Sequence, residues 1–244
     1  MRFSYESYVD LIQLLRETGY QFASYDNFAE YDKCAILRHD VDFKLQDAGR
    51  LASVEQKEGI RSTYFVLLTS DFYNVFSRNS RSLIDGIRRC GHEIGLHFDE
   101  ARYPEEMGNI DLIRKRILEE AGILAKAVGE PVTKVSMHRP SKNILRSNLG
   151  IPGMVNTYSD QFFSAFKYFS DSRHCWREPV EEIIRSGQYY RIQILVHPFW
   201  YDTDETDMGQ AVRSFVNSAN AERYQVLTEN ISDLLDIMGI GEIR

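Results

Sequence analysis

Residues 35–42 read Ala-Ile-Leu-Arg-His-Asp-Val-Asp, an apolar run that ends in ionisable side chains. A short apolar run of this kind is typical of a buried strand. Side chains alternate between the two faces of a strand, so Asp40 and Asp42 lie on one face, where one carboxylate can hold a metal while the other removes a proton. Either carboxylate could instead cap a helix or tie down a turn, and Arg38 could be the partner in a structural ion pair.

Histidine follows an apolar run at two further places. Residues 91–97 read Gly-His-Glu-Ile-Gly-Leu-His, and the run 192–196 is followed by His197. In the first segment we predict His97 as a metal ligand, whereas His92 points to the other face of the strand and is interpreted as a surface or core histidine. His197 is too polar for a core position without a partner, which favours a general acid.

A further histidine, His138, ends the strand that the pattern predicts over residues 132–138. It could be a satisfied core group, or it could be a metal ligand or a substrate contact. Mixed carboxylate and imidazole ligands suit zinc or a similar divalent ion, so these segments together predict hydrolysis assisted by a metal. The aromatic residues 199–201 form either a wall against a sugar ring or plain core.

Strand and helix patterns alternate along most of the chain. The order predicts a parallel, barrel-like α/β domain, in which reactive side chains gather at the carboxyl ends of the strands. Short aromatic strands are expected over 156–176, and Thr228 is expected to cap a final helix. The other expected elements are helices at 5–18, 47–58, 83–90, 105–128 and 208–219, and strands at 35–42, 63–68, 93–97, 132–138 and 192–196.

The length of 244 residues allows one large domain or two small ones. Because no repeat, low-complexity tract or linker divides the chain, we predict a single domain over residues 1–244, with a helical lead-in at 1–33, a barrel core at 34–200 and C-terminal helices at 201–244. A net charge of -7, without a basic cluster, argues against a nucleic-acid partner. No segment reaches the roughly 20 apolar residues that span a bilayer, and the start of the chain lacks an export signal. We therefore expect a cytoplasmic protein whose three cysteines, Cys34, Cys90 and Cys175, are reduced structural thiols.

From about Asp40 to His197, these motifs resemble the polysaccharide deacetylases of the NodB-homology type, carbohydrate esterase family 4. The helical lead-in is similar to the branch associated with bacterial surface-polysaccharide gene clusters. The resemblance implies a distorted (β/α)7-type barrel of mainly parallel strands. It also implies that Asp40 is the catalytic base, that Asp42 and His97 are metal ligands, and that His197 is the acid.

The sequence departs from the family at one ligand. The family usually has a second ligand histidine four residues after the first, and this chain has Ala101 there. His138 is our first choice for the third ligand and Asp99 the second. The segment His138-Arg139-Pro140 resembles a motif that lines the groove, which implies that Arg139 holds the base, and Asp171 resembles the aspartate that orients the acid.

The resemblance implies a hydrolase that removes an N-acetyl group from a sugar, with zinc as the expected metal and cobalt, nickel or manganese as alternatives. Together with the lack of an export signal, it implies a free, nucleotide-linked or lipid-linked sugar in envelope-glycan synthesis. Two alternatives stay open. Ala101 could mark an inactive scaffold that binds a sugar or a partner protein, and paired carboxylates could belong to a metal-independent glycosidase, which would not need His97 and His197. The sequence makes no prediction of oligomeric state.

Overall fold

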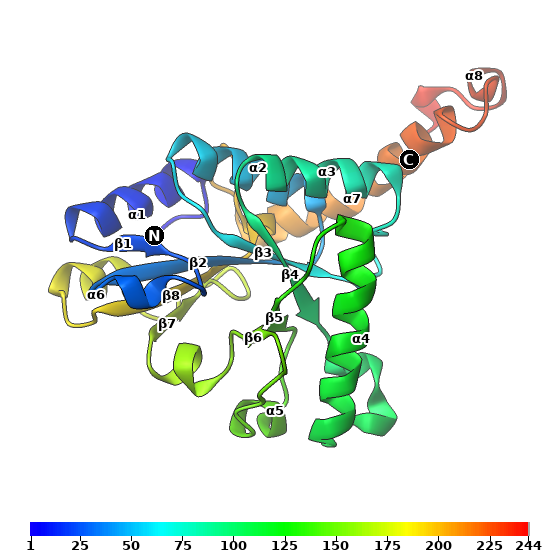
Figure 1. Ribbon diagram of the computed structural model, residues 1–244. Coiled ribbons are helices and arrows are strands. Elements are labelled where there is room, and N and C mark those ends of the chain that lie inside the picture. The colour runs from blue at the N-terminus through cyan, green and yellow to red at the C-terminus, as the bar shows by residue number, and fades with distance from the viewer. Residues whose placement is uncertain (244) are drawn as a thin grey trace. The chain divides into compact units, whose positions relative to one another are not determined.

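The computed structural model describes residues 1–243, and the chain divides into two compact units, Met1–Glu205 and a unit that begins at Thr206. The first unit is an α/β fold in which helices flank a curled sheet of parallel strands (Figure 1). The predicted α/β class with a barrel-like parallel sheet is confirmed. The prediction of one domain over residues 1–244 stays a prediction.

The sheet has the strand order β6-β5-β4-β3-β2-β8-β7, and β1 pairs with the first half of β2. Every strand pair is parallel. β6 and β7 stand at the two ends of this order, so the sheet of the described residues is an open half-barrel. The strands are β1 Gln21–Ala23, β2 Cys34–Val41, β3 Thr63–Leu67, β4 Glu93–Phe98, β5 Lys134–Met137, β6 Val155–Asn156, β7 Lys167–Ser170 and β8 Arg191–Val196.

Helices α1, α2 and α3 cover one face of the sheet (Figure 1). Side-chain caps start α1, α3 and α4, where Ser4, Ser77 and Asn109 accept hydrogen bonds from backbone N–H groups three residues later. The α-helices of the first unit are α1 Tyr5–Glu17, α2 Leu45–Lys57, α3 Arg78–Arg89, α4 Ile110–Val128, α5 Lys142–Arg146 and α6 Val180–Ser186. Its shorter elements are a π-helix at Asp160–Ser164 and 3-10 turns at Phe28–Glu30, Glu100–Arg102, Pro104–Glu106 and Pro198–Trp200.

The second unit contains α7 Met208–Thr228, α8 Leu234–Ile237 and a 3-10 turn at Ile240–Glu242. The Tyr224 hydroxyl of α7 donates a hydrogen bond to the backbone oxygen of Met238, 2.7 Å away. Among the described residues, no helix combines the length and the apolar character that crossing a bilayer requires.

The two faces of β2 carry different chemistry. All eight of its residues are buried, as expected for a central strand covered on both sides. On the outer face, His39 Nε2 lies 2.9 Å from a carboxylate oxygen of Glu55 in α2. Burial alone would raise the pKa of Glu55, but its contacts with His39, His92 and Ser62 lower it to about 2.

The inner face of β2 changes from apolar to ionisable along the strand. Ile36 belongs to a buried cluster of mostly aromatic side chains that includes Phe65 and Phe162, and we call this cluster the aromatic floor. Arg38, Asp40 and Asp42 follow Ile36 at alternate positions. Because the carboxyl ends of parallel strands meet at one edge, Asp42 lies beside the residues that end β4, β5 and β8.

Some local predictions differ from the structure. Thr228 is the last residue of α7, and its hydroxyl donates to the backbone oxygen of Gln225, so its expected role as a helix cap is wrong. The helix-forming residues before it extend α7 beyond the predicted end at 219. Over residues 156–176, where several short aromatic strands are expected, the structure has the last residue of β6, then a π-helix and then β7. His92 is a core histidine, because its ring contacts the backbone of Ser62 and Ala52.

Candidate metal centre

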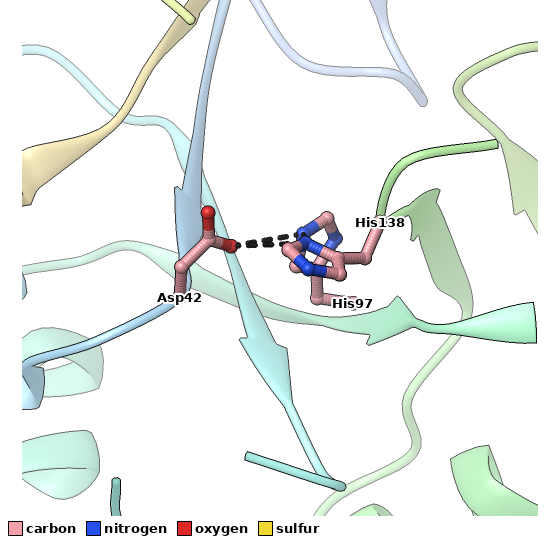
Figure 2. Close-up of side chains that lie close together, drawn as sticks. All are labelled: Asp42, His97 and His138. Carbon is pink, nitrogen blue, oxygen red and sulfur yellow. Dashed lines mark hydrogen bonds and ion pairs between the residues drawn. The ribbon is translucent and has the colours of Figure 1, made fainter. Parts of the chain in front are cut away.

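Three ligand-type side chains converge at the carboxyl edge of the sheet. Asp42 directly follows β2, His97 lies near the end of β4, and His138 directly follows β5 (Figure 2). Asp42 Oδ1 is 3.1 Å from His97 Nε2 and 3.4 Å from His138 Nδ1. The two imidazole nitrogens are themselves 3.1 Å apart, so the three atoms form a nearly equilateral triangle.

The triangle has the dimensions of one face of a metal coordination sphere. Ligand atoms at zinc distances of about 2.0–2.2 Å in a tetrahedron lie about 3.3–3.6 Å from one another. Asp42 Oδ1 is buried and, among the described residues, lacks a hydrogen bond of good geometry despite the nearby nitrogens. Burial alone would raise the pKa of Asp42, but His138 and His97 lower it far below its usual range. An ionised oxygen facing two imidazoles fits a divalent cation.

Asp40 lies beside the triangle but faces Arg38 and Ser136. Its Oδ2 is 3.1 Å from Arg38 Nη2, and Ser136 Oγ is 3.0 and 3.1 Å from its two oxygens. Burial alone would raise the pKa of Asp40, but the charge of Arg38, followed by those of His97 and His197, lowers it. Asp40 is therefore an ionised carboxylate that Arg38 and Ser136 hold beside the ligand atoms.

His197 lies on another side of the triangle, directly after β8. Asp171 is buried, and its carboxylate accepts hydrogen bonds from the His197 backbone N–H and from Nδ1, which is 2.6 Å away. His197 Nε2 thus faces the cluster, 4.0 Å from Asp42 Oδ2. Burial alone would lower the pKa of His197, but Asp171, Asp42 and Asp40 raise it to about 9. Without a bound cation, the imidazole therefore carries a proton at neutral pH.

Two other predicted residues lie outside this group. The Asp99 carboxylate accepts a hydrogen bond from the backbone of Ala101 and lies 3.5 Å from Arg139, so it does not take part in the triangle. The Arg139 side chain is 75% exposed and pairs with Asp99 instead of Asp40. Its backbone is left-handed, with φ of 49°, which turns the chain sharply after His138.

Sequence reasoning missed Ser136 and gave Arg38 only a structural role. Both could have been found from strand alternation, because Ser136 shares a face with His138 and Arg38 shares a face with Asp40. Of the aromatic residues after His197, Trp200 and Tyr201 are buried in the core. Phe199 is half-buried, and its ring lies 4.7 Å from that of Phe43, next to Asp42.

No family model matches the sequence, and no curated protein matches it. Among solved structures, the chain is similar to IcaB from Ammonifex degensii, with 18% identity and a TM-score of 0.45 over 61% of this chain and 73% of that one. It is also similar to the polysaccharide deacetylase Bc1974 from Bacillus cereus, with 16% identity and a TM-score of 0.45 over 78% of this chain and 88% of that one.

A third similar structure is BA3943 from Bacillus anthracis, described as a CE4 family pseudoenzyme. The identity is 12% and the TM-score 0.44, over 77% of this chain and 60% of that one. Structures similar to this chain therefore include both a polysaccharide deacetylase and a pseudoenzyme. Similarity at this level assigns no activity, so the chemistry of the chain has to be inferred from its own residues.

Proposed function

We propose that this chain is a metal-dependent hydrolase that removes an N-acetyl group from a sugar or sugar conjugate. The observation that carries the proposal is the triangle of Asp42, His97 and His138 with an ionised carboxylate and a protonated imidazole beside it. Asp40 Oδ2 lies 3.9 Å from His97 Nε2, and His197 Nε2 lies 4.0 Å from Asp42 Oδ2. The sequence motifs, which resemble those of polysaccharide deacetylases, supply the substrate class.

In this proposal Asp42 Oδ1, His97 Nε2 and His138 Nδ1 hold the ion. A divalent ion, when bound, polarises a carbonyl and lowers the pKa of water. Zinc suits one carboxylate and two imidazoles, and cobalt, nickel and manganese are the alternatives.

Asp40 and His197 then move the protons. Asp40 accepts a proton from the attacking water, whose oxygen forms a bond to the acetyl carbonyl carbon. The carbon–nitrogen bond breaks, and the leaving nitrogen takes a proton from His197 Nε2. Acetate and a free amino sugar result. Asp171 holds the other ring nitrogen of His197, so the proton donor stays aimed at the leaving group.

The substrate that we propose is a free, nucleotide-linked or lipid-linked N-acetylated sugar in envelope-glycan synthesis. Its support is the similarity of the helical lead-in to the branch associated with surface-polysaccharide gene clusters. We also propose the cytoplasm as the location of this reaction.

The charge state of the carboxylates argues against a glycosidase. A glycosidase needs one carboxylic acid that is protonated and donates to the glycosidic oxygen. Asp40 and Asp42 both have lowered pKa values, so neither is a proton donor at neutral pH. The proton donor of this site is instead an imidazole, His197.

The proposal is tested by measuring acetate release and bound metal on the same protein samples. N-acetylated chito-oligosaccharides and a nucleotide-linked N-acetylated sugar serve as probes. Asp40→Asn is expected to keep one metal ion per chain while its kcat falls by roughly 10²-fold to 10⁴-fold. His97→Ala is expected to lose both the metal and the activity, because it removes one corner of the triangle.

Asp111→Asn is the matched control, because the Asp111 side chain is 87% exposed and lies in the first turn of α4. It should retain metal and activity. Unchanged turnover in Asp40→Asn would show that Asp40 is not the base. Sugar binding without acetate release in the wild-type protein would identify an inactive scaffold, and activity that survives complete metal removal would identify a metal-independent enzyme.

A further inference from the structure

Arg38 is a fully buried arginine on the inner face of β2. Its Nη2 lies 3.1 Å from Asp40 Oδ2, 3.0 Å from Ser136 Oγ and 3.1 Å from the Tyr158 hydroxyl, and its Nη1 donates to Thr157. The guanidinium also faces the Tyr158 ring, whose centroid is 4.8 Å away. Hydrogen bonds and an aromatic surface therefore fix the guanidinium, as a planar group with several donors allows.

Ser136 completes the contacts around Asp40. Its hydroxyl lies at nearly equal distances from both carboxylate oxygens, 3.0 and 3.1 Å, and it is completely buried. Ser136 comes from β5 and Arg38 from β2, so two separate strands fix the Asp40 carboxylate. Both of its oxygens therefore have a hydrogen-bond partner outside the ligand triangle.

Asp40 is nevertheless close to the candidate metal centre. Its Oδ2 is 3.9 Å from His97 Nε2, whereas Asp42 Oδ1 is 3.1 Å from the same atom. A shift of less than about 1 Å would bring Asp40 to the spacing that metal ligands have among themselves. A carboxylate this close to a dication is strongly attracted to it, and the contacts with Arg38 and Ser136 oppose that shift.

We propose that Arg38 and Ser136 form a clamp that keeps Asp40 beside the metal centre and prevents it from becoming a fourth protein ligand. The clamp consists of these two side chains. This inference rests on the proposed function, in which Asp40 must stay free to accept a proton. It also keeps one coordination position open, as catalytic metal sites require. Arg38 and Ser136 are thus positioning residues.

Binding of Co²⁺ tests the clamp without measuring activity, because the visible spectrum of Co²⁺ reports its ligands. Ser136→Ala and Arg38→Met are expected to bind one Co²⁺ per chain more tightly than the wild type, with an altered spectrum, because the released Asp40 adds a ligand. Introducing Asp40→Asn into Ser136→Ala should abolish the gain in affinity. Acetate release by Ser136→Ala should fall by roughly 10-fold to 100-fold.

Arg191→Met is the matched control, because the Arg191 guanidinium also faces an aromatic ring, that of Phe28 at 5.4 Å. Arg191 is the first residue of β8, so it lies at the amino end of that strand, away from the carboxyl edge that carries the candidate metal centre. It should keep the wild-type Co²⁺ spectrum. If Arg38→Met does not fold, Ser136→Ala still tests the clamp, because removing one oxygen atom disturbs the fold much less.

A wild-type spectrum and affinity in Ser136→Ala, or a weaker affinity, would overturn the clamp. So would a gain in affinity that persists in the double variant. Absence of acetate release by the wild-type protein counts against the proposed function instead, and it leaves the Co²⁺ result readable.

Discussion

His197 is held between carboxylates on both of its ring nitrogens. Its Nδ1 is 2.6 Å from Asp171 Oδ1, and its Nε2 faces Asp42 at 4.0 Å. Burial alone would lower the pKa of His197, but these carboxylates and Asp40 raise it to about 9. The imidazole therefore stays protonated through neutral pH and loses its proton as the pH rises through about 9. This charge state suits a residue that must donate a proton to a leaving amine.

We predict that Asp171→Asn lowers the pKa of His197 by about 1 to 3, because it removes the nearest opposite charge. The measurement is an NMR titration of the imidazole in the metal-free protein, since a bound cation would itself lower the pKa by repulsion. Asp111→Asn should leave the titration unchanged. A wild-type His197 that titrates near its ordinary value of about 6.5 would contradict the charge assignment.

The two arginines near Asp40 show how far residue types can be assigned from sequence. The motif resemblance favours Arg139 as the partner of the base, but the guanidinium that contacts Asp40 belongs to Arg38. Residues two apart in a strand share a face, so the contact between Arg38 and Asp40 could have been predicted from the sequence. The left-handed backbone at Arg139, which directs its side chain to the surface, had no signal of comparable strength.

At the scale of elements, one glycine of β4 makes room for an aromatic ring of β3. Gly95 of β4 is in register with Phe65 of β3, and the Phe65 ring is completely buried in the aromatic floor below Arg38. A Cβ atom on Gly95 would overlap the Phe65 ring and lie 3.2 Å from the backbone oxygen of Lys134. The missing side chain therefore gives Phe65 its place in the floor of the half-barrel.

We predict that Gly95→Ala lowers the free energy of unfolding by roughly 1–3 kcal/mol, as overpacking of a filled core does. Urea denaturation gives the value. Gly122→Ala is the control, because Gly122 lies in the middle of α4, where an added Cβ would meet no other element within 4 Å. That change should stabilise the protein by about 0.5–1 kcal/mol. A neutral or stabilising Gly95→Ala would contradict the packing described for Phe65.

Most of the longer elements could be predicted from the sequence, and most of the shorter ones could not. Strands β2, β3, β4 and β8 are apolar runs in which most or all residues are buried, and burial on both faces leaves a clear signal. The three-residue strand β1 and the helices α5 and α6 carry few apolar positions, so no period emerges. Their form depends on contacts with the rest of the fold.

At the scale of the whole molecule, the parallel sheet explains why distant segments meet. Asp42, His97 and His138 are far apart in sequence, but each lies at or just after the carboxyl end of its strand. The alternation of strands and helices was therefore enough to predict a common edge. Which residue completes the triangle could not be decided in the same way, because His138 and Asp99 both follow strands, and only the fold shows that Asp99 faces Arg139.

The most direct test of the metal centre is an anomalous difference map, measured at the zinc absorption edge on crystals grown with one equivalent of zinc. We predict one peak about 2.0–2.2 Å from Asp42 Oδ1, His97 Nε2 and His138 Nδ1, with Asp40 outside the coordination shell. Absence of a peak at this position, or a peak that Asp99 coordinates in place of His138, would contradict the account.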